Sequence, residues 1–139
     1  MAYKRKTWAD KMNDGREPVV EIAGKTFAGV EKGSKMVIAT PKVVDAYIRN
    51  IPKGVHTSLM QMREDLAAEY NADTTCPLTS GIFLRIVAEN AYDEYQQGKA
   101  ISKITPFWRM IDKRSPTCKK LSFGYDFVKE QRAKENLPE

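Results

Sequence analysis

Three helical patterns follow one another in residues 40–98, which read TPKVVDAYIRNIPKGVHTSLMQMREDLAAEYNADTTCPLTSGIFLRIVAENAYDEYQQG. In the first pattern, apolar side chains recur at i, i+3, i+4 and i+7, a spacing that places them on one helical face. These side chains are Val44, Tyr47, Ile48 and Ile51. Thr40 is a good N-cap, and Pro41 suits the first helical position. The sequence therefore predicts a helix that begins at Pro41 and ends before Pro52.

Two more helices are predicted in the same segment. Ser58 is the expected N-cap of the second helix, with Gln61 at the spacing of a capping box. The apolar stripe of this helix comprises Leu59, Met62, Leu66 and Tyr70. The third helix is expected to begin between Pro77 and Thr79 and to end at Gly98, a plausible C′ residue. Its expected buried face comprises Ile82, Phe83, Ile86, Val87 and Ala91.

The segments that flank these helices carry other patterns. Before them, residues 19–22 and 36–38 are short β-rich runs that could pair as strands. After Gly98 we expect an extended segment that leads into residues 107–111, and then a polar, basic loop over residues 112–120. A last helix is expected near the C-terminus, with Phe127, Val128 and Gln131 toward the core.

The order helix, helix, turn, helix, extended pair and loop is typical of winged-helix proteins, in which one helix lies in a DNA groove. We therefore predict an α+β, winged-helix-like (helix-turn-helix) domain over residues 41–139. Residues 1–40 are expected to form a basic N-terminal arm with short extended segments.

Composition excludes several classes of protein. The chain has 139 residues, of which 42% are hydrophobic and 29% are charged, a balance typical of soluble globular domains. No apolar run approaches the ~18 residues of a membrane span, and no apolar region follows the basic N-terminus as in a signal peptide. Two cysteines without a CxxC motif and a single histidine indicate neither a disulfide scaffold nor a metal site. We expect a cytoplasmic protein without a cofactor.

Charge is distributed unevenly along the chain. The net charge is +5, but residues 1–42 carry +4, residues 43–98 carry −4 and residues 99–139 carry +5. A polyanion such as DNA would be attracted to the two basic ends. The alternative interpretation is an ordinary soluble surface rich in lysine.

A family resemblance rests on three short motifs. The first helix is followed by Ile51-Pro52-Lys53-Gly54 and then by Ser58, the third helix holds the run LRIVA at 84–88, and PFWRM follows at 106–110. In order and approximate spacing, residues 43–111 resemble the DNA-binding half of alkylguanine-DNA alkyltransferases. Those enzymes have an I-P-x-G turn, a serine that opens the next helix, a recognition helix with A-R-A-V-G and an active-site segment P-C-H-R-V. The resemblance implies a winged-helix DNA-binding domain.

The departures from this family decide the expected activity. The enzymes use a cysteine thiolate as alkyl acceptor and a histidine that activates it. Those two positions hold Phe107 and Trp108 here, so this segment cannot transfer an alkyl group. The chain thus resembles alkyltransferase-like proteins, which lack the cysteine and bind alkylated DNA without repairing it. The resemblance implies a monomeric, non-enzymatic binder of duplex DNA, including alkylated DNA, with a role in DNA repair. Leu59 replaces the family's tyrosine that helps rotate a nucleotide out of the duplex.

Arg85 is the residue that the resemblance places as the finger that fills the gap left by an extruded base. Ser80 is the rival for this position, and an exposed arginine without function is the alternative. Glu89, Asp93 and Glu94 follow on the same helix and would repel phosphate there.

The other candidate DNA contacts are hydroxyls near helix N-termini and cations in turns, both of which suit phosphate oxygens. They are Lys53, Thr57, Ser58, Thr79, Ser80, Arg114, Lys119 and Lys120. The alternatives are simple helix capping and a solvated surface. Phe107, Trp108 and Arg109 are the candidate base pocket, since aromatic rings stack on bases. Alternatively, the two rings fill the vacated pocket as core and Arg109 makes a structural hydrogen bond.

Two other functions remain open at this point. The acidic middle segment favours a protein-interaction module on the same scaffold. An alkyl acceptor with a displaced nucleophile would use Cys76, which lies near a helix start where the dipole lowers a thiol pKa. A small buried residue is the alternative for Cys76.

Overall fold

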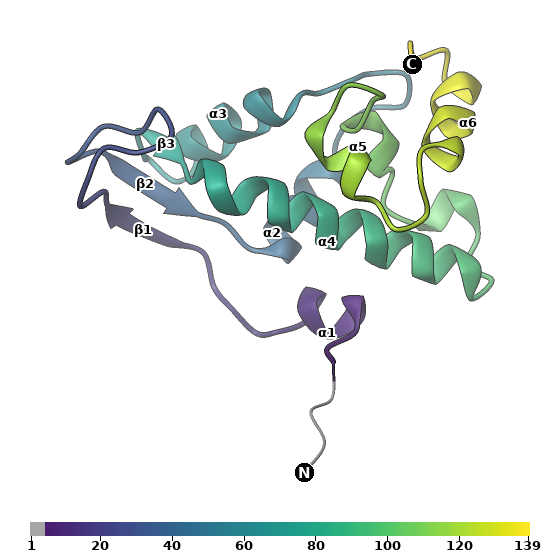
Figure 1. Ribbon diagram of the computed structural model, residues 1–139, viewed down its shortest axis with the longest axis horizontal. Coiled ribbons are helices and arrows are strands. Elements are labelled where there is room, and N and C mark those ends of the chain that lie inside the picture. The colour runs from purple at the N-terminus through teal and green to yellow at the C-terminus, as the bar shows by residue number, and fades with distance from the viewer. Residues whose placement is uncertain (1–4) are drawn as a thin grey trace.

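The computed structural model describes residues 5–139 and is an α+β structure of six α-helices, two short 3₁₀ helices and a three-stranded sheet. The elements in chain order are α1 (Trp8–Met12), β1 (Val19–Ile22), β2 (Lys35–Ile38), α2 (Pro41–Arg49), α3 (Leu59–Glu69), β3 (Thr74–Thr75), α4 (Pro77–Gln96), η1 (Ile101–Lys103), η2 (Phe107–Arg109), α5 (Pro116–Lys120) and α6 (Asp126–Lys134). Helix α4 crosses the molecule, with the sheet near its N-terminal end (Figure 1). In this view α1 lies on one side of α4, and α5 and α6 lie on the other.

The three helices predicted in residues 40–98 are confirmed. The side chain of Thr40 accepts a hydrogen bond from the Val43 amide at the start of α2, and Ser58 accepts one from the Gln61 amide at the start of α3. Each side chain satisfies an amide that has no partner within its own helix. Helix α4 begins at Pro77, and Gly98 follows it with φ of +102°, a conformation that glycine adopts without steric cost. The predicted C-terminal helix is confirmed as α6.

The two β-rich runs pair, as the sequence suggested. Strand β1 is antiparallel to β2, with Val20 opposite Val37, and β2 is parallel to the two-residue strand β3. Strand β3 lies in the segment that the sequence predicted as a turn. All four residues of β1 are exposed, so this edge strand is held by its ladder to β2 rather than by burial.

The prediction for the chain after Gly98 is wrong in part. The segment expected to be extended forms η1 and η2, and the expected basic loop over 112–120 contains α5. The strands of residues 5–139 all precede α4, so the segment in the position of a wing is helical. Ile101 and Ile104 are three residues apart, and a 3₁₀ helix repeats every three residues, so this spacing suits the observed structure as well as an extended one.

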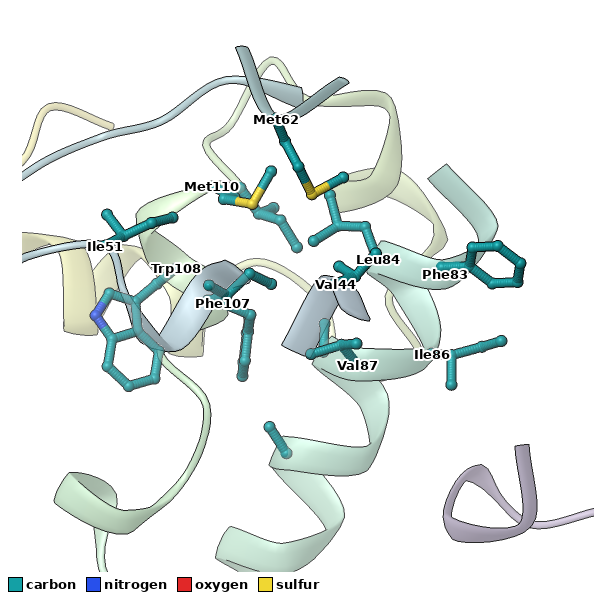
Figure 2. Packing of buried hydrophobic residues seen from close by; sticks show 14 of the residues in the cluster. Val44, Ile51, Met62, Phe83, Leu84, Ile86, Val87, Phe107, Trp108 and Met110 are labelled. Atoms are coloured by element: carbon teal, nitrogen blue, oxygen red, sulfur yellow. The ribbon is translucent and has the colours of Figure 1, made fainter. Parts of the chain in front are cut away.

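The main core surrounds α4. Figure 2 shows the residues of this cluster, with Trp108 at one end and Phe83 and Ile86 toward the other. Ile82 was expected in the core but is 56% exposed. Helix α4 buries a broad face that includes Phe83, Ile86 and Val87, and Ile82 lies on the remaining stripe together with Leu78, which is also exposed.

Helix α6 is tied to the rest of the core by two charged side chains. Arg132 is 1% exposed and donates hydrogen bonds to the carbonyl oxygens of Trp108 and Pro138, both at 2.7 Å. Its guanidinium also lies 3.1 Å from Nδ1 of His56. Glu135 follows α6 and accepts hydrogen bonds from Arg109, from the Trp108 indole and from the Gly54 amide. These bonds join the C-terminal segment to the chain around η2.

Replacing Arg132 with methionine should destabilise the protein. The methionine keeps much of the volume but leaves the buried Trp108 carbonyl without its donor, so we expect the free energy of unfolding to fall by about 2–4 kcal/mol. Urea denaturation measures the change. The matched control is Arg114→Met, which removes an exposed guanidinium and should change stability by less than about 0.5 kcal/mol. Equal effects of the two substitutions would contradict the role of Arg132.

His56 should make stability depend on pH. Burial lowers the pKa of His56, and the charge of Arg132 lowers it further, against the opposite effect of Asp112. Protonation therefore favours the unfolded chain, whose histidine pKa is about 6.5. The contribution of His56 is complete above that pH and is lost as the pH falls through the folded pKa. The test is urea unfolding of the native protein and of His56→Gln between about pH 7.5 and pH 5.5. The difference between their free energies of unfolding should change with pH. A constant difference would exclude this coupling.

Candidate nucleic-acid interface

A basic groove lies between α1 and α4. Its volume is about 370 Å³. The lining residues are Lys6, Trp8, Lys11, Arg16, Gly81, Ile82, Arg85, Ile86 and Lys120. Five of them are cations and none is acidic, and within residues 5–139 no carboxylate lies within 4.0 Å of the amines of Lys6, Lys11 and Lys120. The groove therefore concentrates positive charge.

Trp8 organises one wall of this groove. Thr7 and Asp10 form a capping box that starts α1 and directs Trp8 toward α4. The amine of Lys11 lies 4.4 Å from the centre of the indole ring, and the guanidinium carbon of Arg85 lies 5.3 Å from it. Cation–π attraction to one ring holds both cations near each other despite their mutual repulsion.

The carboxylates on α4 that were expected to repel phosphate are largely engaged. Glu89 is 2% exposed, and its carboxylate accepts hydrogen bonds from the Ser122 amide and hydroxyl. It also pairs with Arg85, with 3.4 Å between Nε and Oε2. Glu94 forms an ion pair with Lys99. Burial raises the pKa of Asp93, and the charge of Glu89 adds to this effect. The repulsion expected from Glu89 and Glu94 is therefore smaller than the sequence indicated, whereas Asp93 has no ion-pair partner within residues 5–139.

Two predicted DNA contacts, Arg85 and Lys120, meet in the groove, although they are 35 positions apart in the chain. Ser80 does not join them, because it is buried and its hydroxyl donates a 2.6 Å hydrogen bond to the Cys76 carbonyl. This bond closes the first turn of α4. The neighbouring Thr79 hydroxyl is buried without a hydrogen-bond partner within the described chain.

The remaining predicted contacts are scattered. Ser58 and Arg114 line a separate hollow beside α3, and Lys119 is exposed on α5 outside the groove. The Thr57 amide donates a hydrogen bond to the Arg109 carbonyl. Lys53 lies in the turn after α2 and lines another cavity, on the α6 side of the molecule. The structure does not gather these residues into one surface.

The three residues predicted as a base pocket form structural contacts. Phe107 is fully buried and packs against Phe123 and Phe127, with ring centres 5.8 and 5.9 Å away. Trp108 is 4% exposed, and its indole donates to Glu135 over 2.7 Å. Arg109 donates to Glu135 and to the Ile51 carbonyl. This arrangement matches the alternative in which the rings fill the core.

Four lining residues of the groove were not predicted from the sequence, namely Lys6, Trp8, Lys11 and Arg16. The available signals were the basic charge of the arm and the capping-box pair Thr7 and Asp10. A five-residue helix carries too little periodicity for detection from sequence, and its place against α4 is a tertiary contact.

Both cysteines are buried and unpaired. Cys76 is 5% exposed, as expected for a small core residue, and burial raises the pKa of Cys118. Within residues 5–139 no cluster of histidine, cysteine and acidic residues could hold a metal ion. A search of the same residues finds no helix with the length and apolarity to cross a membrane.

The fold and the groove define a small α+β protein with a cationic, tryptophan-lined surface between its N-terminal helix and its central helix. No family model, curated protein or solved structure matches the chain.

Replacing Trp8 with alanine should detach α1 from α4. The variant loses the contact of the indole with the core and both cation–π contacts, so we expect a loss of about 1–3 kcal/mol in stability. Faster amide exchange at Lys11 and Asn13, whose amides donate within α1, should report the detachment. Lys11→Met is the control because it removes a single cation–π contact. Unchanged exchange in Trp8→Ala would contradict the anchoring role of the indole.

Proposed function

We propose that this protein is a non-enzymatic DNA-binding protein that contacts the phosphate backbone through the groove between α1 and α4. The observation that supports this most directly is the convergence of five cations in a lining that contains no carboxylate. These cations come from the N-terminal arm, α4 and α5, which are remote in sequence. Convergence of like charges costs electrostatic free energy in the free protein, and an anionic partner removes that cost.

Binding through such a groove follows the physics of counterion release. Each phosphate that a lysine or arginine neutralises frees condensed counterions, so affinity falls as the salt concentration rises. Three groove cations are most available to phosphate: Lys6, Lys11 and Lys120. Asp14 and Glu89 pair with the two groove arginines, and neither carboxylate is within ion-pair distance of these lysines. Arg85 keeps its pair with Glu89 and helps to shape the wall.

The finer part of the proposal is a relation to alkyltransferase-like proteins on a winged-helix scaffold, with recognition of an alkylated base. The order of α2, α3 and α4 and the motifs around Lys53, Arg85 and Arg109 support it. Two features do not support this relation: the segment in the wing position is helical, and the rings of Phe107 and Trp108 are buried. DNA binding through the groove does not depend on this relation.

A protein-interaction module is the second candidate function. The observation that favours it is a set of exposed apolar side chains on the N-terminal half of α4, on α3 and on the edge strand β1. They are Leu78, Ile82, Met60, Val19, Val20 and Ile22. Exposed apolar groups of this kind are typical of contact surfaces when they are contiguous.

A matched pair of lysines tests the proposal. Lys119 and Lys120 are neighbours on α5, but Lys120 lines the groove and Lys119 does not. Fluorescence anisotropy with a labelled duplex should show tighter binding as salt is lowered. Lys120→Ala should weaken binding and reduce the slope of log K against log salt by about 1, whereas Lys119→Ala should leave the slope unchanged.

If Lys119→Ala and Lys120→Ala change DNA binding equally, DNA does not bind in the groove. Absence of binding to any duplex at low salt would overturn the DNA-binding proposal and favour the protein-interaction module. A second duplex that contains a methylated guanine tests the finer part: tighter binding to it supports lesion recognition, and equal binding restricts the function to general DNA binding.

A further inference from the structure

A second cavity lies between α2, the two 3₁₀ helices and α6, and we name it the α2–α6 cavity. Its volume is about 380 Å³, which is within the range of small-molecule sites in proteins. The walls are formed by Ile101, Ile104, Pro106 and Trp108, and the polar lining by Arg49, Lys53, Ser102, Arg109, Gln131, Lys134 and Glu135. Trp108 and Ile86 lie at different ends of the core in Figure 2, which separates this cavity from the basic groove.

Gln131 is the unusual residue of this cavity. Its side chain is on α6, only 6% of the residue is exposed, and within residues 5–139 its amide has no hydrogen-bond partner. The amide atoms themselves are open to the cavity, because the hydroxyls of Thr79 and Tyr125 are the only polar side-chain atoms of residues 5–139 that are buried without a hydrogen-bond partner. The amide lines the cavity, where a bound molecule can supply both the acceptor and the donor that it lacks.

The charges around the cavity suit a single negative charge. Arg109 is paired with Glu135, Arg49 with Asp45, and Lys134 with Glu130. Lys53 is the one lining cation without an ion-pair partner in the described chain. The seven polar side chains of the lining carry a net charge of +3. The carboxylates of Asp45 and Glu130, which lie outside the lining, reduce this to +1, and the exposed Lys53 is the cation left unpaired.

Hydrogen bonds fix the Glu135 carboxylate in the lining of the cavity. The carboxylate of Glu135 accepts hydrogen bonds from Arg109, Trp108 and Gly54, which come from three different places in the chain. Burial alone would raise the pKa of Glu135, but the bond from Arg109 and the bonds from Gly54 and Trp108 outweigh burial and keep it lowered. The pair of Arg109 and Glu135 in the lining therefore stays charged at neutral pH.

We propose that the α2–α6 cavity binds a small organic anion that has one negative charge and a flat apolar body. The apolar body lies against Ile104, Pro106 and Trp108, the anionic group reaches Lys53 at the rim, and a polar atom of the ligand pairs with the amide of Gln131. This site is separate from the proposed DNA contact and does not depend on it.

The first test uses 8-anilinonaphthalene-1-sulfonate, a monoanion with aromatic rings whose fluorescence rises in apolar surroundings. The native protein should give a saturable increase that corresponds to one site. Lys53→Met should weaken this binding about tenfold, which is the loss of one ionic contact to the ligand. Arg85→Met, which removes a cation from the basic groove instead, is the matched control and should leave binding unchanged.

A pair of competitors isolates the charge. Indole-3-acetate and indole-3-acetamide have nearly the same size and shape, but only the first is an anion at neutral pH. The acetate should displace the dye at a concentration at least tenfold lower than the amide, and Lys53→Met should abolish that difference.

Gln131→Leu separates a binding role from a structural one. The leucine removes an amide that has no partner in the protein, so the urea midpoint should stay the same or rise, while dye binding weakens. A fall in the midpoint would show that the amide stabilises the fold. Such a fall would overturn the proposal. So would the absence of a dye signal, or an Arg85→Met variant that weakens dye binding as much as Lys53→Met does. Equal displacement of the dye by indole-3-acetate and indole-3-acetamide would also overturn it.

Discussion

The rest of the structure depends on the carboxylate of Glu135. It receives hydrogen bonds from Trp108, Arg109 and Gly54, and so it joins the end of the chain to η2 and to the turn after α2. Arg132, on the helix that Glu135 follows, adds bonds from inside the core to two carbonyl oxygens. Buried charges of this kind are costly to separate, because a single partner left behind is neither solvated nor paired. The segment that begins at Pro106 is therefore held in one arrangement, although it contains no strand and only three residues of 3₁₀ helix.

The α2–α6 cavity and the basic groove differ in how their cations are paired. At the α6 end, cations have been neutralised by built-in partners, and what remains open is a small cavity with one free lysine and one unpartnered amide. At the α1 end, Arg16 and Arg85 are also paired, but three lysines of the groove have no carboxylate of residues 5–139 within ion-pair distance. These lysines are Lys6, Lys11 and Lys120. The first arrangement suits a small ligand that is recognised by shape and hydrogen bonds. The second suits an extended polyanion, for which charge density matters more than shape.

The sequence predicted the helices well because each has a local cause. Thr40 and Ser58 cap their helices through side-chain oxygens, and Gly98 ends α4 with a positive φ. The prediction failed where local patterns are ambiguous. An apolar residue every third position is compatible with a 3₁₀ turn or an extended chain, so the region after Gly98 was expected to be extended. Ile82 was expected in the core because periodicity shows where an apolar stripe runs but not how wide the buried face is.

The sequence by itself determined the α+β class, the three consecutive helices, the two early β-rich runs and the basic character of both ends of the chain. It also indicated Arg85 and Lys120 separately, from a motif and from charge. Only the tertiary structure decided that these two cations share a groove with Trp8, that Phe107 is core, and that Gln131 lines the α2–α6 cavity. The physical reason is that capping and periodicity act within a few residues. A groove or a cavity depends instead on side chains that the packing of distant segments brings together.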